Sequence, residues 1–222
     1  MDDLLPLPID VVSDVVCPWC FLGKRRLEAA LASIPEIEIE IRWRPFQLDP
    51  GIPPGGVDRV TYFRQKFGDV GRVEAIHAQL RELGTAVGIR FAFEAIARTP
   101  NTLDAHRLIR WATVEGTQDA VVDRLFRLYF EEGADIGDHA VLAAAAADTG
   151  MNGAVAARLL AGDADRNEVV AEIEQARRLG VTGVPCTILD GRYAVMGAQE
   201  PATLANAIAQ VAAERTSGAD GR

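Results

Sequence analysis

Two stretches near the start of the chain have the periodicity of β-strands, and a helical stretch separates them. Residues 9–16 form an apolar run broken by Asp10, Ser13 and Asp14, which is typical of a buried strand. Residues 37–44 alternate between apolar and charged side chains, which predicts a strand with one solvated face. Residues 18–33 have the spacing of a helix, and we expect that helix to end before Pro35.

The middle of the chain is predicted to be almost entirely helical. Residues 47–58 are rich in Pro and Gly, which indicates a loop. From about residue 60 to residue 179 the pattern is helical, with breaks near residues 84–101, 116, 133–138, 150 and 162. Asn101 and Asp138 are suitable N-cap residues for two of these helices.

Strand-like segments return near the end of the chain. Residues 187–189 and 193–196 flank Asp190 and Gly191, a pair favoured in two-residue hairpin turns. Residues 202–214 predict a final helix, and residues 217–222 a frayed tail. This order predicts an α/β protein with a thioredoxin fold and a large α-helical insertion after the second strand. We assign residues 1–58 and 162–216 to the thioredoxin fold and residues 59–161 to the insertion.

Composition and charge exclude several classes of protein. The 222 residues, 49% of them apolar and 25% charged, are typical of a globular protein. A net charge of −9 argues against nucleic acid or an anionic membrane as partner. The longest run without a charged residue, 201–213, is shorter than the roughly 20 apolar residues of a membrane-spanning helix. The first residues lack the basic and apolar pattern of a secretory signal, so we expect a cytoplasmic protein.

The sequence Cys17-Pro18-Trp19-Cys20 is the strongest chemical signal in the chain. Pro18 suits the first position of a helix, which makes Cys17 the N-cap residue. We expect the helix dipole and the free N–H groups to lower the pKa of Cys17. Cys20, one turn further along, should stay a protonated thiol. The asymmetry assigns Cys17 the attack on a substrate disulfide and Cys20 the resolution of the mixed disulfide.

A zinc site or a haem attachment site suits the cysteine pair less well. Zinc would need two further ligands, and a haem attachment site would need His where this chain has Phe21. We therefore predict no metal site. The cysteines and histidines left as zinc ligands have no short spacing between them: Cys186, His77, His106 and His139.

The segment Gly183-Val184-Pro185 opens the late hairpin. We expect Pro185 to be cis and to pack against the cysteine motif, which leaves the Val184 backbone free to pair with an extended substrate. The alternative is an ordinary trans proline at the head of a strand. Side chains alternate along a strand, so Cys186 should point into the core beside Ile188. The alternative for Cys186 is a third redox thiol.

Several further motifs accompany the cysteine pair: Ser13–Cys20 with Gly23 and Lys24, Arg44–Leu48, Pro100–Thr102 with Ala105 and His106, Tyr129 and Phe130, Gly133–Asp138, Gly183–Pro185, and Gly197–Gln199. With them the sequence resembles the DsbA-like thioredoxin proteins over nearly its whole length. Within these it resembles the FrnE-like branch, which is related to 2-hydroxychromene-2-carboxylate isomerases and kappa-class glutathione transferases.

The resemblance implies thiol–disulfide exchange on protein or small-molecule thiols and disulfides, with the helical insertion shaping a pocket over Cys17. It implies no bound cofactor, with glutathione as a possible co-substrate. The related isomerases and transferases generally have Ser where this chain has Cys17, which favours redox chemistry. The alternatives are a glutathione-dependent isomerase or transferase, and a holdase whose helical domain binds unfolded chains.

The resemblance also suggests which residues contact substrate: Pro18, Trp19, Val184, Phe46, Asn101 and His106. Phe46, like Trp43, equally suits the core, and His106 equally suits a hydrogen bond within the insertion. Many thioredoxins bury an acid six residues before the first cysteine, where this chain has Val11. Asp14 is the nearest acid, three residues before Cys17. Residues 24–26, all basic, are predicted to form a solvated helix turn.

Overall fold

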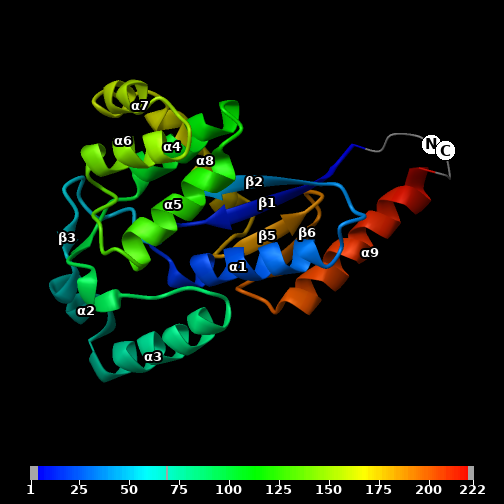
Figure 1. The fold of residues 1–222 in the computed structure, drawn as a ribbon, viewed down its shortest axis with the longest axis horizontal. Coiled ribbons are helices and arrows are strands. Elements are labelled where there is room, and N and C mark those ends of the chain that lie inside the picture. Colours follow the sequence, from blue (N-terminus) through cyan, green and yellow to red (C-terminus); the bar gives the residue numbers. More distant parts are fainter. Residues whose placement is uncertain (1–4, 69, 220–222) are drawn as a thin grey trace.

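A four-stranded sheet forms the centre of the protein, whose computed structural model describes residues 5–68 and 70–219 (Figure 1). The strand order is β2-β1-β5-β6. Strands β1 (Leu7–Ser13) and β2 (Ile39–Pro45) are parallel. Strand β5 (Cys186–Leu189) is antiparallel to β1, and β6 (Tyr193–Met196) is antiparallel to β5. This is the predicted thioredoxin fold.

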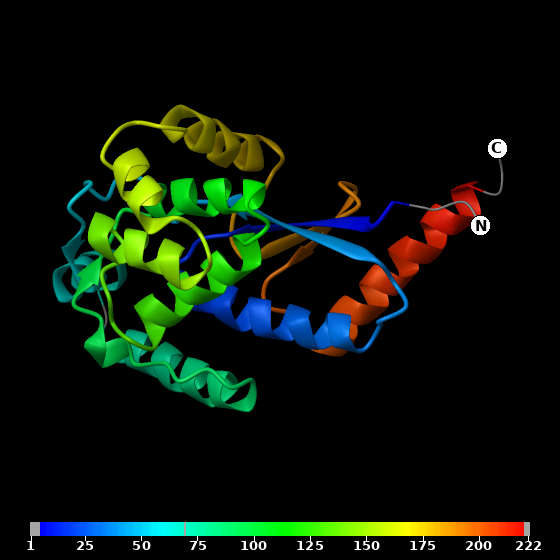
Figure 2. The ribbon, with the colours of Figure 1, turned by 45° about the horizontal axis from the view of Figure 1, so that its top comes forward.

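Helices cover both faces of this sheet (Figures 1 and 2). Helices α1 (Pro18–Ala32) and α9 (Pro201–Ala219) pack against each other on one face, and α8 (Arg166–Arg178) lies on the other. Alternation along β1 gives each face its own core. Val11 belongs to the large cluster that includes α1 and α9, whereas Val12 packs with Ala176 of α8. The predicted tail at 217–219 is wrong, because α9 continues to Ala219, and residues 220–222 lie outside the described residues.

The insertion after β2 contains the helices α2 (Arg59–Phe67), α3 (Val70–Ala86), α4 (Leu103–Val114), α5 (Gln118–Phe130), α6 (His139–Asp148) and α7 (Gly153–Leu160). It also holds a short 3-10 helix, Phe93–Ala95, and a two-stranded ribbon of β3 (Val57–Asp58) and β4 (Arg98–Thr99). The sequence pattern does not predict the ribbon, because two residues are too few to show a strand period.

One hydrophobic core runs from the sheet into the insertion. The ring of Phe21 in α1 stacks on Phe126 of α5 with centroids 5.1 Å apart and meets the edge of Phe91 at 6.0 Å. Helix α3 also packs against α1. Because the thioredoxin fold and the insertion share this core, the core does not separate them. The assignment of residues 59–161 to a separate insertion domain therefore stays a prediction.

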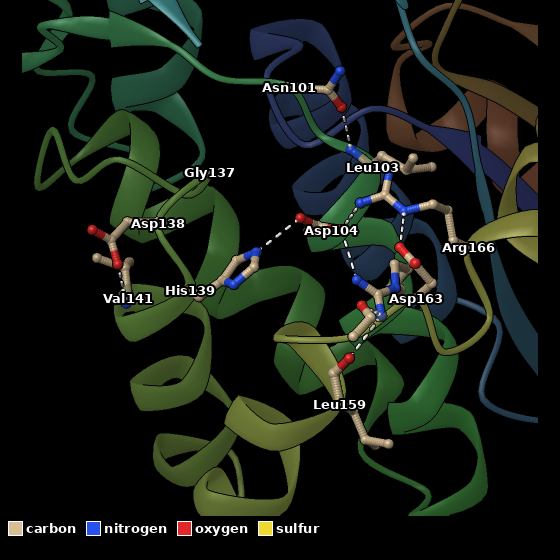
Figure 3. Close-up of polar contacts among 12 residues, drawn as sticks. Asn101, Leu103, Asp104, Gly137, Asp138, His139, Val141, Leu159, Asp163 and Arg166 are labelled. Atoms are coloured by element: carbon tan, nitrogen blue, oxygen red, sulfur yellow. Dashed lines mark hydrogen bonds and ion pairs between the residues drawn. The ribbon is translucent and has the colours of Figure 1, made fainter. Parts of the chain in front are cut away.

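The N-terminus of α4 is built differently from the prediction. Thr102 is the N-cap, and the Asn101 side chain accepts a hydrogen bond from the Leu103 amide at 3.0 Å (Figure 3). Asn101 thus caps the same turn from one position earlier, as short amide side chains do when they bond two residues onward. Asp138 is the N-cap of α6 as predicted, and its carboxylate accepts from the Ala140 amide at 2.6 Å.

The β5–β6 hairpin turns at the predicted residues. Leu189 pairs with Tyr193, as the predicted strand ends require, so residues 190–192 form a three-residue loop. Asp190 and Gly191 have φ values of 53° and 65°, and the Arg192 amide donates to the Leu189 carbonyl at 3.0 Å. Asp190 and Gly191 adopt the left-handed conformation that hairpin turns favour, and the loop is one residue longer than the two-residue turn for which this pair is typical.

Candidate active site

Cys17 lies where β1 passes into α1. It is the N-cap residue of α1 with Pro18 in the first turn, as predicted. Its carbonyl accepts from the Cys20 amide at 3.0 Å, and its own amide donates to the Asp14 carbonyl at 2.9 Å. The Cys17 sulfur lies 3.7 Å from the Val184 carbonyl oxygen, and the residue is 4% exposed. The fold thus brings together two segments that are 167 residues apart in the sequence.

Cys20 lies one turn into α1 and is 1% exposed. Burial is the main cause that raises its pKa well above 9.0, and the neighbouring Cys17 sulfur raises it further. The Ser13 hydroxyl and the Asp14 backbone act in the opposite direction and are outweighed. Cys20 is therefore a thiol at neutral pH, as the sequence predicted.

Pro185 packs directly on α1, and the Val184–Pro185 peptide bond is cis, as predicted. A Cβ atom at Gly23 would lie 3.0 Å from the Pro185 Cγ atom, so glycine at this point of α1 allows the close approach. Cys186 is 0% exposed and packs with Val12 on the opposite face of the sheet from α1. Burial raises the pKa of Cys186, and its predicted place in the core is confirmed.

A cavity of about 370 Å³ opens beside Cys17, and we call it the Cys17 cavity. Its wall comes from the loops after β1 and β2, from α2 and α3, from the end of α5, from residues 183–184, and from Thr99, Pro100 and Thr102. The predicted contact residues Pro18, Trp19 and Val184 line it. Most of the wall is apolar, with six aromatic side chains: Trp19, Tyr62, Phe63, Phe67, Tyr129 and Phe130.

The other three predicted contact residues do not line the Cys17 cavity. Phe46 is buried with Val12 and Cys186. The Asn101 amide donates to the Ile52 carbonyl at 2.6 Å and accepts from Gln47 at 3.0 Å. These two hydrogen bonds hold the loop after β2, which forms part of the cavity wall, so Asn101 supports the wall without facing the cavity.

His106 is also behind the wall. Its Nε2 lies 2.9 Å from the Phe46 carbonyl oxygen and 3.5 Å from the Asp14 Oδ1 atom. A carbonyl only accepts hydrogen bonds, so Nε2 carries the proton. The alternative expectation of a bond within the insertion is wrong, because this bond joins α4 to the end of β2.

Asp14 is a buried acid in the wall of the Cys17 cavity. Its Oδ2 atom accepts from the Leu48 amide at 2.9 Å. Its Oδ1 atom is buried and receives no hydrogen bond from any residue that the structure describes. A buried acceptor without a donor is costly, and Asp14 shares this feature with the Ser13 and Thr99 hydroxyls nearby.

Arg59 belongs to the site although no sequence motif indicates it. Arg59 is the first residue of α2, lines the Cys17 cavity and is 9% exposed. Its Nη1 donates to the Tyr129 hydroxyl at 3.1 Å, and its guanidinium lies 4.3 Å from the Phe63 ring centre. Burial lowers the pKa of Arg59 and raises that of Tyr129 to about 12. The sequence indicates Tyr129 only as part of a family motif.

His77 and Tyr62 also line this cavity, and the pKa of each is shifted. Burial lowers the pKa of His77 to about 4, and the charges of Arg59 and Arg81 lower it as well, so its ring is neutral at pH 7. The Tyr62 hydroxyl donates to Asp49 at 3.0 Å, and burial together with that carboxylate raises the pKa of Tyr62.

The predicted solvated turn at residues 24–26 is wrong. Lys24 is 2% exposed, and its ammonium donates to Asp119 of α5 at 2.8 Å. Arg26 is buried and donates to the Ala198 carbonyl at 2.6 Å. Helix periodicity could not show that α5 and the segment after β6 cover this side of α1.

No group of three His, Cys, Asp or Glu side chains suited to a metal ion occurs within residues 5–68 and 70–219. Over the same residues, none of the helices has the length and apolar character needed to cross a membrane.

Comparison with known proteins adds to this geometry. The sequence profile of the DSBA-like thioredoxin domain matches residues 8–209. The crystal structure of a probable DsbA oxidoreductase from Streptomyces coelicolor is similar to this chain, with 31% sequence identity and a TM-score of 0.85 over 92% of this chain and 89% of that chain.

Two more distant structures share the fold. 2-Hydroxychromene-2-carboxylate isomerase has 17% identity and a TM-score of 0.72 over 95% of this chain and 98% of that chain. The cytosolic disulfide reductase DsbM from Pseudomonas aeruginosa, solved with GSH, has 17% identity and a TM-score of 0.60 over 96% of this chain and 100% of that chain.

Proposed function

The chain belongs to the DsbA-like thioredoxin family, and from this we propose that it is a thiol–disulfide oxidoreductase with Cys17 as nucleophile and Cys20 as resolving thiol. The difference between the two sulfurs carries the proposal. Cys17 occupies the N-cap position of α1 and lines a cavity, whereas Cys20 is buried one turn further in with a raised pKa. Thiolates are the attacking species, so the order of attack follows from this difference.

The reaction takes place in two exchanges. The Cys17 thiolate attacks one sulfur of the substrate disulfide, a new S–S bond forms, and the other substrate sulfur leaves as a thiolate. Cys20 then loses its proton and attacks the Cys17 sulfur, which releases the second substrate thiolate. The protein dithiol has lost two electrons to the substrate and ends as a Cys17–Cys20 disulfide. The same two exchanges in reverse, starting from the Cys17–Cys20 disulfide, oxidise a substrate dithiol.

We propose that the Asp14 carboxylate accepts the proton that Cys20 loses before it attacks the Cys17 sulfur. Its carboxylate is buried, its Oδ1 atom has no hydrogen bond from the described residues, and its backbone adjoins the Cys20 sulfur. Asp14 also lines the Cys17 cavity, which gives the proton a route to solvent. It stands in for the acid that is missing at Val11.

Substrate would enter the Cys17 cavity against Pro18 and Trp19, with the backbone of Val184 beside the Cys17 sulfur. Glutathione is a suitable co-substrate, and the DsbM structure solved with GSH supports this choice. DsbM is a cytosolic reductase, which also supports the cytoplasm as the site of action.

Reduction of insulin by dithiothreitol tests this function. We expect the protein to accelerate it, and both Cys17→Ser and Cys20→Ser to abolish the acceleration, while Cys186→Ala keeps it. Full acceleration by Cys17→Ser would refute the assignment of the nucleophile.

A glutathione-dependent isomerase is the second candidate, since the isomerase fold matches with a TM-score of 0.72 and the cavity is mostly apolar. Turnover of 2-hydroxychromene-2-carboxylate that requires glutathione and survives Cys20→Ser would favour it.

A further inference from the structure

The Cys17 cavity contains a positive charge that has no negative partner among the described residues. Among all the residues that the structure describes, four cationic side chains are buried: Lys24, Arg26, Arg59 and Arg107. Three of the four contact a carboxylate: Lys24 pairs with Asp119, Arg26 with Glu200 and Arg107 with Asp104.

Arg59 differs from these three. Within residues 5–68 and 70–219 it has no ion pair, and its side chain contacts the Tyr129 hydroxyl and the Phe63 ring. Removing a cation from water without a partner is strongly unfavourable, which is why buried charges are almost always paired. A guanidinium has five N–H donors in a planar fork that matches a carboxylate. The hydrogen bond to Tyr129 uses only one of these donors.

The acids of the cavity wall do not supply the missing partner. Asp49 accepts from Tyr62 at 3.0 Å and pairs with Lys66 at 3.6 Å. Asp14 accepts from the Leu48 amide and lies 3.5 Å from His106, on the side of α4. Neither carboxylate forms an ion pair with Arg59 in the part of the chain that the structure describes.

The rest of the wall indicates what else the ligand must contain. Arg59 lies among aromatic side chains of α2 and α5, and His77 nearby is neutral because burial lowers its pKa. The volume of about 370 Å³ suits a small molecule, and apolar walls with few polar groups bind an apolar body while the polar group fixes its orientation. Cys17 lines the same cavity.

We propose that the Cys17 cavity binds a small disulfide or thiol with an aromatic body and a carboxylate, and that Arg59 binds this carboxylate while the sulfur meets Cys17. The proposal rests on the proposed thiol–disulfide exchange and names its substrate class. Arg59 is thereby a binding residue for substrate, a role that the cysteine motif does not reveal.

Two disulfide reagents test it directly. 5,5′-Dithiobis(2-nitrobenzoate) has an aromatic ring and a carboxylate on each half, whereas 4,4′-dithiodipyridine is aromatic and carries no carboxylate. With either reagent, Cys17 attacks one reagent sulfur and one arylthiolate leaves. Cys20 then displaces the second arylthiolate, so the protein dithiol is oxidised and the reagent reduced. The second-order rate of the first release is measured for both reagents at a salt concentration of about 0.15 M.

Arg59→Gln removes the proposed contact, and Arg64→Gln is the matched control. Arg64 lies on the same helix, is exposed and does not line the cavity, so its loss changes the net charge equally. We expect Arg59→Gln to lower the ratio of the nitrobenzoate rate to the dithiodipyridine rate about tenfold or more, because a buried charge pair is lost. Arg64→Gln should leave that ratio within about twofold, because exposed charges are screened.

A measurement without exchange chemistry keeps the two proposals separate. Titration calorimetry compares 2-nitrobenzoate with the neutral 2-nitrobenzamide on the Cys17→Ser form, with and without Arg59→Gln. We expect preference for the carboxylate that disappears with Arg59→Gln. Equal binding of both compounds, or equal rate ratios for Arg59→Gln and Arg64→Gln in folded protein, would overturn the inference. Failure of both reagents to react with Cys17 would instead refute the proposed function.

Discussion

Replacing the buried Arg107 by leucine should strongly destabilise the protein. Arg107 is fully buried in α4, and its Nε donates to the Ala164 carbonyl at 2.6 Å. Its Nη2 donates to the carbonyls of Leu159 and Gly162 at 2.8 and 2.7 Å, and its Nη1 to Asp104 at 2.8 Å. One side chain thereby holds the connection between α7 and α8 against α4.

The magnitude follows from what the substitution leaves behind. Leucine has no donors, so three carbonyls and one carboxylate lose a charge-assisted partner. Breaking a buried ion pair by removing one partner costs about 3–5 kcal/mol. For a chain of this size each kcal/mol lowers Tm by roughly 2–4 °C, so we expect Arg107→Leu to lower Tm by roughly 6–20 °C.

Arg166→Leu is the matched control, because Arg166 contacts the same Asp104 carboxylate from a half-exposed position at 3.4 Å (Figure 3). Exposed ion pairs contribute about 1 kcal/mol or less, so this variant should lower Tm by no more than roughly 4 °C. Circular dichroism during thermal and urea unfolding measures both. Equal losses for the two variants would refute the claim that burial of Arg107 makes its contacts strong.

The pH dependence provides a second test of this network. Burial opposes ionisation of Asp104, but hydrogen bonds from Arg107 and His139 outweigh it and lower the pKa of Asp104 below 3.8. A carboxyl with a lowered pKa in the folded state stabilises the protein above its unfolded pKa and loses that effect as the pH falls through the folded value. The difference in stability between wild type and Arg107→Leu should therefore shrink below pH 3.8. A difference that stays constant as the pH falls from neutral to well below that value would contradict the assignment.

Two other predictions concern the thiols. Iodoacetamide should label reduced native protein first at Cys17, more slowly at Cys20, which is buried with a raised pKa, and hardly at all at Cys186, which is buried on the opposite face of the sheet from α1 and does not line the Cys17 cavity; peptide mass spectrometry gives the order, and a Cys17–Cys186 disulfide would contradict it. Asp14→Asn should slow the second arylthiolate release from 5,5′-dithiobis(2-nitrobenzoate) about 100-fold at pH 7, with the rate rising as the pH rises, and leave the first release nearly unchanged. Equal slowing of both releases would indicate a purely structural role for Asp14.

The sequence predicted those features of the site that depend on a single helix or strand. Pro18 fits the first turn of a helix, so the position of Cys17 at the N-cap followed from four residues. Alternation along a strand placed Cys186 in the core. Both predictions use rules that operate within one element, and both are confirmed.

Residues whose environment comes from distant segments could not be predicted in this way. Arg59 and Tyr129 are 70 residues apart and meet only because α2 and α5 both pack near Cys17. Lys24 is buried by α5, although its own helix gives no sign of a covering element. His106 contacts the Phe46 carbonyl from 60 residues away. In each case a charged or polar side chain is buried by another element, which the periodicity of its own helix does not record.

The most direct test of the division of roles between Cys17 and Cys20 uses proteins with a single thiol. The chain has three cysteines, so Cys20→Ser and Cys17→Ser are each combined with Cys186→Ala and treated with glutathione disulfide. Intact-protein mass spectrometry follows the mixed disulfide over time at pH 7. We predict rapid formation of a stable mixed disulfide on Cys17 in the first protein and at least about 100-fold slower formation on Cys20 in the second, because a thiol with a pKa well above 9.0 is less than about 1% thiolate at that pH. Equal rates, or faster reaction of Cys20, would contradict the account.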